Sequence, residues 1–146
     1  MMQLRAHDRF SRTIRLSESE ISKFAQAVGD SNPLHHDAAV AEVSRYGRII
    51  ASGSQTTSLL MGLAATHFSR IGPMVGLEFT FLFRAAVPAD ERLQLEWLVV
   101  RVTPTANTSG AVVELRGRLR IPDGVTAVGA KGKVLIAGTD VQCPRS

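Results

Sequence analysis

Residues 53–69, GSQTTSLLMGLAATHFS, decide the fold of this chain. If they form a helix, its leucine, methionine, alanine and phenylalanine side chains cover most of the circumference. A helix that is apolar nearly all round is buried, either inside a core or wrapped by a sheet. Gly53 stands at its start, and Gly72-Pro73 interrupts the chain after it. The stretch therefore predicts a central helix that the rest of the chain covers.

After this helix the hydrophobic period changes from 3.6 to 2, which is typical of half-buried strands. The first such segment begins at Met74, and the last runs from Val125 to Ala137. The inward residues expected in the first three segments are Leu77, Phe79, Phe81 and Phe83, then Leu93, Leu95, Trp97 and Val99, then Val113, Leu115, Leu119 and Ile121. Short connections separate the four segments, among them the turn signal Pro122-Asp123-Gly124. Consecutive strands joined in this way predict an antiparallel meander.

The N-terminal part has strand and helix signals of its own. Residues 8–16 read as a short strand or extended arm. A capping box, Ser17-x-x-Glu20, precedes apolar residues at helical spacing and predicts a helix over about 18–27, which Gly29 ends. Asp37 is placed to cap a second helix over about 38–45.

Together these elements predict one α+β domain over residues 1–146, with a curved antiparallel sheet wrapped around the central helix and a polar tail from about 138. A lone curved sheet leaves edges and apolar surface exposed. We therefore expect a homodimer or a larger assembly built from dimers.

Composition narrows the class of protein further. Hydrophobic residues make up 45% and charged residues 21%, as in an ordinary folded protein rather than a disordered one. No apolar run approaches the roughly 20 residues that cross a bilayer, and the polar N-terminus is unlike a secretory signal. Cys143 is the single cysteine, so an intramolecular disulfide and a cysteine-based metal cluster are excluded. We expect a cytoplasmic protein.

The formal net charge of +4 favours anionic partners. Arg116, Arg118 and Arg120 alternate along one strand, but no aromatic residues interleave with them, so nucleic-acid binding is not favoured. A solvated outer face of the sheet explains these arginines better. A phosphorylated small ligand, such as the nucleotide end of coenzyme A, fits the same charge.

The chemistry is expected in the turn Gly29-Asp30-Ser31-Asn32-Pro33-Leu34-His35. Proline cannot continue a helix, so an Asp and a His five residues apart are held on a turn between two helices. Such a pair suits general acid/base catalysis. The competing interpretation is a plain Asx-turn with the histidine at the surface.

This turn, extended from Ala27 to His35, and Ile50-Ala51-Ser52-Gly53 further on resemble the hydratase motif of the MaoC-like proteins. These are (R)-specific enoyl-CoA hydratases and dehydratases with the hot-dog fold, and the resemblance covers roughly residues 10–137. It implies reversible addition of water to an acyl-CoA substrate, a trans-2-enoyl thioester of fatty acid metabolism, with no metal and no organic cofactor. It also implies no nucleic-acid or membrane partner.

The resemblance implies a role for each motif residue. Asp30 and His35 hold the reacting water between them, and either is open as the formal base. The backbone N–H of Gly53 faces the thioester oxygen, as the free N–H groups at a helix start permit. Asn32 is expected to bond locally and support the loop beside the substrate. Ser52, which is expected at the substrate site like Asn32, stands where many members have histidine, and capping of the helix is its expected role.

Several assignments stay open. Leu59, Leu63 and Phe79 are candidates for an acyl tunnel, although packing is the commoner role of such residues. Lys131 and Lys133 are candidates for contacts with coenzyme A phosphates.

Three other functions are compatible with parts of the sequence. A hot-dog thioesterase would direct water at the thioester carbonyl and would not need the Asn-Pro-x-His turn. A non-catalytic acyl-binding module would not need an intact Asp30 and His35. An iron site made of His35, Asp37 and His67 would need a strand setting that this turn lacks, and His36 and His67 are expected to be ordinary solvent-facing or helix-face residues.

Overall fold

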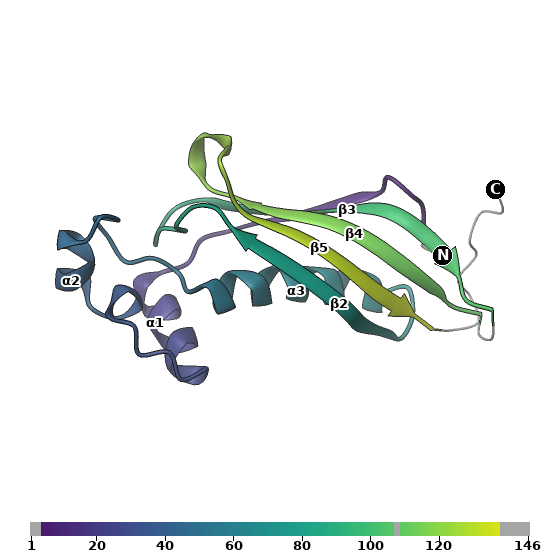
Figure 1. Cartoon of the computed structure of the whole chain (residues 1–146), viewed down its shortest axis with the longest axis horizontal. Coiled ribbons are helices and arrows are strands. Elements are labelled where there is room, and N and C mark those ends of the chain that lie inside the picture. The colour runs from purple at the N-terminus through teal and green to yellow at the C-terminus, as the bar shows by residue number, and fades with distance from the viewer. Residues whose placement is uncertain (1–3, 107–108, 138–146) are drawn as a thin grey trace.

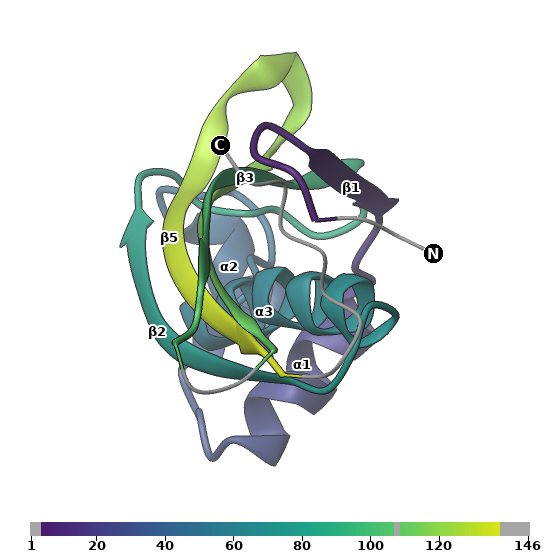
Figure 2. The ribbon, with the colours of Figure 1, turned by 90° about the vertical axis from the view of Figure 1, so that its right-hand side faces the viewer.

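The chain folds as a five-stranded antiparallel sheet that curves around one long helix (Figures 1 and 2). The computed structural model describes residues 4–106 and 109–137. The strands are β1 (Arg9–Ile14), β2 (Met74–Phe83), β3 (Leu93–Pro104), β4 (Ala111–Arg120) and β5 (Thr126–Ile136). The helices are α1 (Glu18–Ala27), α2 (Ala38–Val43) and α3 (Gly53–Ser69), with short 3-10 turns η1 (Pro33–His35) and η2 (Pro122–Gly124). The predicted α+β class and the central helix over 53–69 are confirmed.

The strand order is β1-β3-β4-β5-β2, so the predicted meander is wrong at β2. Only β3, β4 and β5 follow one another as neighbours, while β2 crosses to the far side and pairs with β5. A side-chain fit accompanies this pairing: the Phe79 ring of β2 lies over Gly132 of β5, where an added Cβ would come within 2.6 Å of it. Hydrophobic alternation predicts which face of a strand is buried, but it does not predict which strand lies beside it in the sheet.

The core lies between the concave face of the sheet and α3. Trp97 of β3 is fully buried, and its indole Nε1–H donates to the Leu60 carbonyl in the middle of α3 at 2.8 Å. Gly117 faces Trp97 across the β3–β4 pair, and a Cβ there would come within 2.4 Å of the ring. The large aromatic ring therefore needs a glycine opposite it, and this contact sets the distance between helix and sheet.

Helix α3 is buried on one side only. The buried residues on it are Gln55, Thr56, Leu60, Leu63, Ala64 and Phe68. Met61 is 40% exposed, and Gly62, Ala65 and Thr66 also face outward. The prediction of a helix covered all round is thus wrong for a single chain, because the sheet reaches only part of its circumference.

The helix caps that the sequence predicts for the two N-terminal helices are present. The Ser17 hydroxyl accepts from the Glu20 N–H at 3.1 Å, and α1 runs over the predicted residues. Asp37 caps α2, which ends at Val43, two residues earlier than predicted, where Ser44 turns to extended backbone. Both helices gather at the N-terminal end of α3 (Figure 1).

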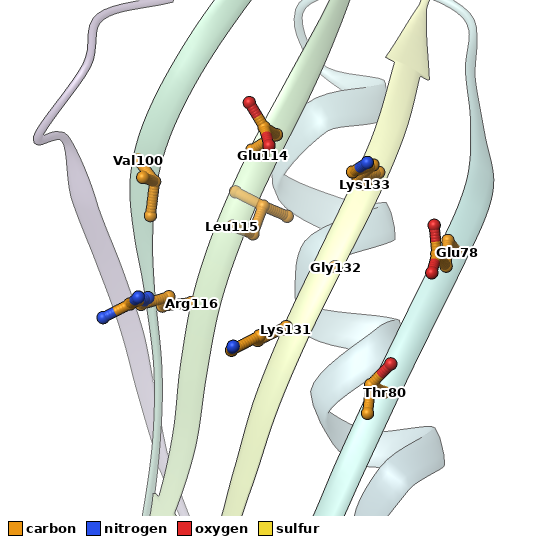
Figure 3. Close-up of a pocket in the computed structure, with 9 residues that line it drawn as sticks. All are labelled: Glu78, Thr80, Val100, Glu114, Leu115, Arg116, Lys131, Gly132 and Lys133. Carbon is orange, nitrogen blue, oxygen red and sulfur yellow. The ribbon is translucent and has the colours of Figure 1, made fainter.

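The outer face of the sheet is charged (Figure 3). Lys133 lies between Glu78 and Glu114 in the strand register, and Lys131 lies between Thr80 and Arg116. Both lysines lie on the face of the sheet opposite α3 (Figure 3). The expectation that they contact coenzyme A phosphates stays a prediction.

The remaining arginines of β4 also fit a solvated face. Arg118 pairs with Glu96 at 3.3 Å, and Arg120 donates to the Gln94 side chain at 2.7 Å. The predicted tail from about 138, with Cys143, lies outside the described residues. Within the described residues, no helix combines the length and the apolar character needed to span a bilayer.

Strand β2 forms an apolar edge that predicts self-association. Val75 and Leu77 are 56% and 53% exposed, and β2 pairs with a neighbour on one side only. We expect the protein to sediment with twice the mass of one chain. Leu77→Lys places a charge on this edge and is expected to shift the population toward monomer while the far-ultraviolet circular dichroism stays unchanged. A wild-type chain that remains monomeric at high micromolar concentration contradicts the prediction.

Candidate active site

Local hydrogen bonds hold the turn after α1 and position Asp30. Gly29 ends the helix with φ +76°, a conformation that glycine adopts without strain. The Asp30 N–H donates to the Ala25 carbonyl at 2.8 Å, and the Asn32 N–H donates to Asp30 Oδ1 at 3.0 Å. Asn32 Oδ1 in turn accepts from the Leu34 N–H at 3.1 Å. This geometry leaves Asp30 Oδ2 as the oxygen that points away from the turn, and it confirms the local bonding expected of Asn32.

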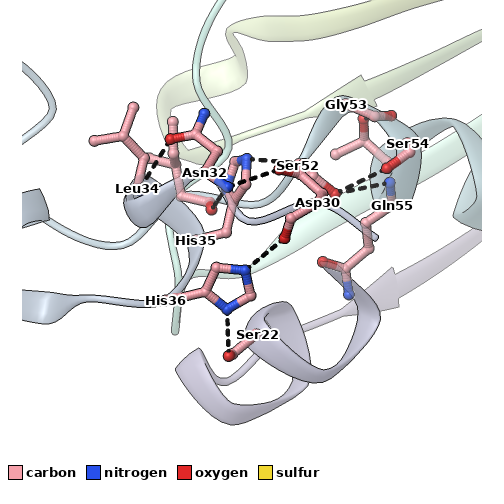
Figure 4. A network of polar contacts seen from close by, with 12 residues as sticks. Ser22, Asp30, Asn32, Leu34, His35, His36, Ser52, Gly53, Ser54 and Gln55 are labelled. Carbon is pink, nitrogen blue, oxygen red and sulfur yellow. Dashed lines mark hydrogen bonds and ion pairs between the residues drawn. The ribbon is translucent and has the colours of Figure 1, made fainter. Parts of the chain in front are cut away.

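His35 faces Asp30 from the end of the same turn (Figure 4). It is 6% exposed, and its Nδ1 lies 2.7 Å from the Ile50 carbonyl. Because a carbonyl oxygen can only accept, Nδ1 carries the proton, and in the neutral ring Nε2 has a free lone pair. His35 Nε2 and Asp30 Oδ2 are 3.5 Å apart. Two acceptors therefore face each other across a gap with no direct hydrogen bond in the neutral state.

The segment that receives the His35 bond is itself fixed on two sides. The Ile50 N–H donates to the Leu34 carbonyl at 3.3 Å, which joins it to the turn. The Ala51 N–H donates to the Val87 carbonyl at 2.8 Å, and the Ala89 N–H donates to the Ile49 carbonyl at 3.0 Å. Residues 49–51 thus connect the Asp30–His35 turn to the loop after β2 and lead directly into α3.

Ser52 and Gly53 form the start of α3. The Ser52 hydroxyl accepts from the Gln55 N–H at 3.2 Å, so its predicted capping role is confirmed. Within the described residues the Gly53 N–H has no acceptor, as expected for the first residue of a helix. The Phe83 ring lies over Gly53, and an added Cβ would meet it at 3.0 Å. Gly53 therefore offers a free backbone donor beside an aromatic wall.

A cavity of about 500 Å³ brings His35 and Gly53 together. Buried residues of its wall include Ala51, Thr56, Val87 and Val128. Asp30 is not among the residues that line this cavity. It lines a second hollow together with Ser31 and His36, and its Oδ2 lies 3.5 Å from His35 Nε2. The cavity has the size of a small-molecule site, and its wall combines apolar side chains with polar and charged ones.

The candidate tunnel residues pack elsewhere. Leu63 belongs to the buried core, and Phe79 lies edge-on to Trp97 with ring centroids 6.0 Å apart. Leu59 packs against the same core, and none of the three lines this cavity. The structure favours packing as their role.

His36 has a structural role that the sequence analysis missed, and the expectation of an ordinary surface residue is wrong. Its Nε2 donates to the Asp30 carbonyl at 2.7 Å, and its Nδ1 bonds the Ser22 hydroxyl of α1 at 2.7 Å (Figure 4). The ring therefore ties the Asp30 turn to α1. In the sequence, nothing distinguishes a histidine with this structural role from an exposed one. The role becomes visible only through the contact with Ser22, which is 14 residues away in the sequence.

His67 is remote from the turn. It lies near the other end of α3 from Gly53, roughly 21 Å away at about 1.5 Å per residue. It stacks on Phe10 with ring centroids 3.8 Å apart, and burial, together with the nearby Arg70, lowers its pKa. His67 therefore cannot complete an iron site with His35 and Asp37. Among the described side chains, no group of three His, Cys, Asp or Glu residues is arranged to hold a metal ion.

The curved sheet around one helix is the hot-dog fold. The profile of the MaoC like domain matches residues 3–116, and this chain belongs to the MaoC-like dehydratase family. Comparison with curated protein sequences gives no match.

Solved structures of similar proteins agree with this family. An (R)-hydratase from A. caviae involved in PHA biosynthesis is 25% identical, with a TM-score of 0.79 over 92% of this chain and 98% of that one. An R-hydratase from Pseudomonas aeruginosa is 23% identical, with a TM-score of 0.78 over 98% and 92%. The HadBC (3R-hydroxyacyl-ACP dehydratase) complex from Mycobacterium tuberculosis is 17% identical, with a TM-score of 0.73 over 89% and 96%, and shares the fold.

The His36 contact predicts a measurable effect on the Asp30 turn. His36→Leu removes the donor to the Asp30 carbonyl and leaves a partly buried carbonyl without a partner, which costs about 1–3 kcal/mol of the free energy of unfolding. His36→Gln keeps an N–H donor and is expected to recover much of that stability. Chemical denaturation of the two variants and wild type provides the measurement. Equal stability of His36→Leu and wild type contradicts the assigned role.

Proposed function

We propose that this protein is an (R)-specific enoyl-CoA hydratase that also catalyses the reverse dehydration of a 3-hydroxyacyl-CoA. The observation that carries the proposal is the 3.5 Å gap between His35 Nε2 and Asp30 Oδ2, two acceptors beside a cavity that contains a free backbone donor. Membership of the MaoC-like family and the similarity to an (R)-hydratase support the reaction and its stereochemistry.

Water is the species that the gap suits best. It donates one hydrogen to His35 Nε2 and the other to Asp30 Oδ2, which directs its lone pair toward the β-carbon of a bound enoyl thioester. One acceptor takes a proton as the O–Cβ bond forms and the π electrons move to the thioester oxygen. The same acceptor then gives that proton to the α-carbon, so the pair ends the cycle unchanged.

The developing negative charge needs a donor on the opposite side of the substrate. The Gly53 N–H supplies it, with the partial positive charge at the N-terminal end of α3. Ser52 keeps this helix start in place through its bond to the Gln55 N–H. Asn32 keeps the Asp30 turn in place through the Leu34 N–H. Neither residue lines the cavity, so both are proposed to support the site through these local bonds.

The proposed substrate is a trans-2-enoyl thioester of coenzyme A from fatty acid metabolism, handled without metal or organic cofactor in the cytoplasm. The apolar wall formed by Ala51, Val87 and Val128 suits an acyl chain. The exposed edge of β2 supports action as a homodimer or a dimer-based assembly.

Loss of enoyl thioester absorbance over a panel of enoyl-CoA chain lengths tests the reaction. We expect wild type to hydrate at least one chain length and Asp30→Asn to lose about 10²–10⁴-fold in rate, the usual contribution of a general acid or base. Release of free thiol is followed in the same assay. Thiol release without hydration supports the hot-dog thioesterase instead, and binding without turnover supports an acyl-binding module. An undiminished rate of hydration by Asp30→Asn contradicts the proposal.

A matched pair of substitutions at Gly53 isolates the backbone donor. Gly53→Pro removes the N–H, and proline is well tolerated at the first position of a helix. Ser52 already has the extended backbone, ψ 151°, that the residue before proline prefers. Gly53→Ala keeps the N–H but introduces the same Cβ against Phe83.

The rate of the Gly53→Pro variant is expected to fall about 10²–10³-fold below that of Gly53→Ala, the usual cost of one oxyanion donor. Thermal unfolding of both proteins controls for damage to α3. Equal rates of two folded variants show that Gly53 is not the donor.

A further inference from the structure

Two arginines line the same cavity as His35 and Gly53. Arg45 follows α2, and Arg84 follows directly after β2, so the two guanidinium groups come from different parts of the chain. Both arginines are exposed, whereas Ala51 and Val128 of the same wall are buried. The cavity therefore has a charged outer part and an apolar inner part.

These two arginines differ from the paired arginines of the chain. Ion pairs join Arg9 and Arg118 to Glu96, Arg48 to Glu91, and Arg101 to Glu114. In the described part of the chain, neither Arg45 nor Arg84 has a carboxylate within ion-pair distance, and none of the residues lining the cavity is acidic. Arg45 contacts the Tyr46 ring, with its guanidinium carbon 5.4 Å from the ring centroid. Uncompensated positive charge at a cavity attracts an anionic ligand.

The position of the charge indicates which part of a ligand is anionic. An apolar chain fits the buried inner wall, and a group held by Arg45 and Arg84 remains at the exposed outer part. In a thioester substrate the arm beyond the sulfur extends away from the acyl chain, and in biological thioesters this arm carries phosphate esters. Guanidinium groups bind phosphate through paired N–H donors.

We propose that Arg45 and Arg84 bind the phosphate groups on the carrier arm of the thioester, which rests on the proposed function. Phosphate chemistry is common to the nucleotide of coenzyme A and to the phosphopantetheine of a carrier protein. The charge of the outer cavity thus selects substrates by their carrier arm, while the apolar wall receives the acyl group.

Steady-state kinetics of the double variant Arg45→Gln, Arg84→Gln test this assignment. With an enoyl-CoA we expect KM to rise about 10–100-fold with little change in kcat, because charged hydrogen bonds to a distant group stabilise substrate and transition state alike. With the same enoyl group on N-acetylcysteamine, which has no phosphate, we expect wild type and the double variant to be equal. Arg12→Gln on β1, which removes an exposed arginine outside this cavity, is the matched control. Arg45→Lys, Arg84→Lys is expected to restore part of the affinity.

The two phosphate sources give different results. A rise in KM for both the coenzyme A thioester and a carrier-protein thioester assigns the phosphopantetheine phosphate, and a rise for the coenzyme A thioester alone assigns the nucleotide. Four results overturn the proposal. In two of them KM rises equally for the N-acetylcysteamine thioester, or rises only for substrates with an acyl carboxylate. In the other two KM rises for the carrier-protein thioester alone, or does not rise at all.

Calorimetric binding of adenosine 3′,5′-bisphosphate and of free coenzyme A separates this proposal from the proposed reaction. Neither probe reacts, so arginine-dependent binding of coenzyme A by a wild type that hydrates nothing leaves the phosphate site standing and removes the hydratase. If wild type hydrates an enoyl-CoA but binding of both probes does not depend on the two arginines, the hydratase proposal stands and the phosphate site is overturned.

Discussion

The hydrogen bond from His35 Nδ1 to the Ile50 carbonyl, 2.7 Å long, is the interaction on which the site depends. It fixes the tautomer of the neutral ring, in which Nε2 faces Asp30 with a lone pair. It also spans 15 residues, since Ile50 lies in the segment that leads into α3. One contact thereby sets the chemical state of the imidazole and its position relative to the free N–H of Gly53.

The scaffold holds this arrangement through a contact in the middle of α3. The Trp97 indole donates to the Leu60 carbonyl, and Leu60 is roughly 10 Å along the helix from Gly53 at about 1.5 Å per residue. The fit of Trp97 against Gly117 fixes the sheet under this point of contact. A helix anchored in its middle by packing presents its first N–H group in a defined place, which a donor for developing charge requires.

The sequence predicted what local chemistry determines and missed what depends on distant neighbours. Capping by Ser17, Asp37 and Ser52 and the helix end at Gly29 follow from the side chain and backbone at one position, and all four are present. The place of β2 beside β5, where the Phe79 ring lies over Gly132, is a pairing of distant strands that alternation does not encode. The same limit applies to the site: Asp30 and His35 stand out in the motif, whereas the bonds of His36 and the shared cavity of Arg45 and Arg84 appear only in three dimensions.

In the proposed reaction, the role of each acceptor depends on how many hydrogens the bound molecule can donate. Water has two, so it bonds both His35 Nε2 and Asp30 Oδ2. The 3-hydroxyl group of the product has one, so it bonds a single acceptor and leaves the other free. By microscopic reversibility the free acceptor is the one that removes the α-hydrogen during dehydration. A gap of 3.5 Å between two acceptors therefore suits both directions of the reaction without a change in the charge of the resting pair. That property follows from the Ile50 carbonyl, because a ring with its proton on Nε2 would offer a donor to the gap instead.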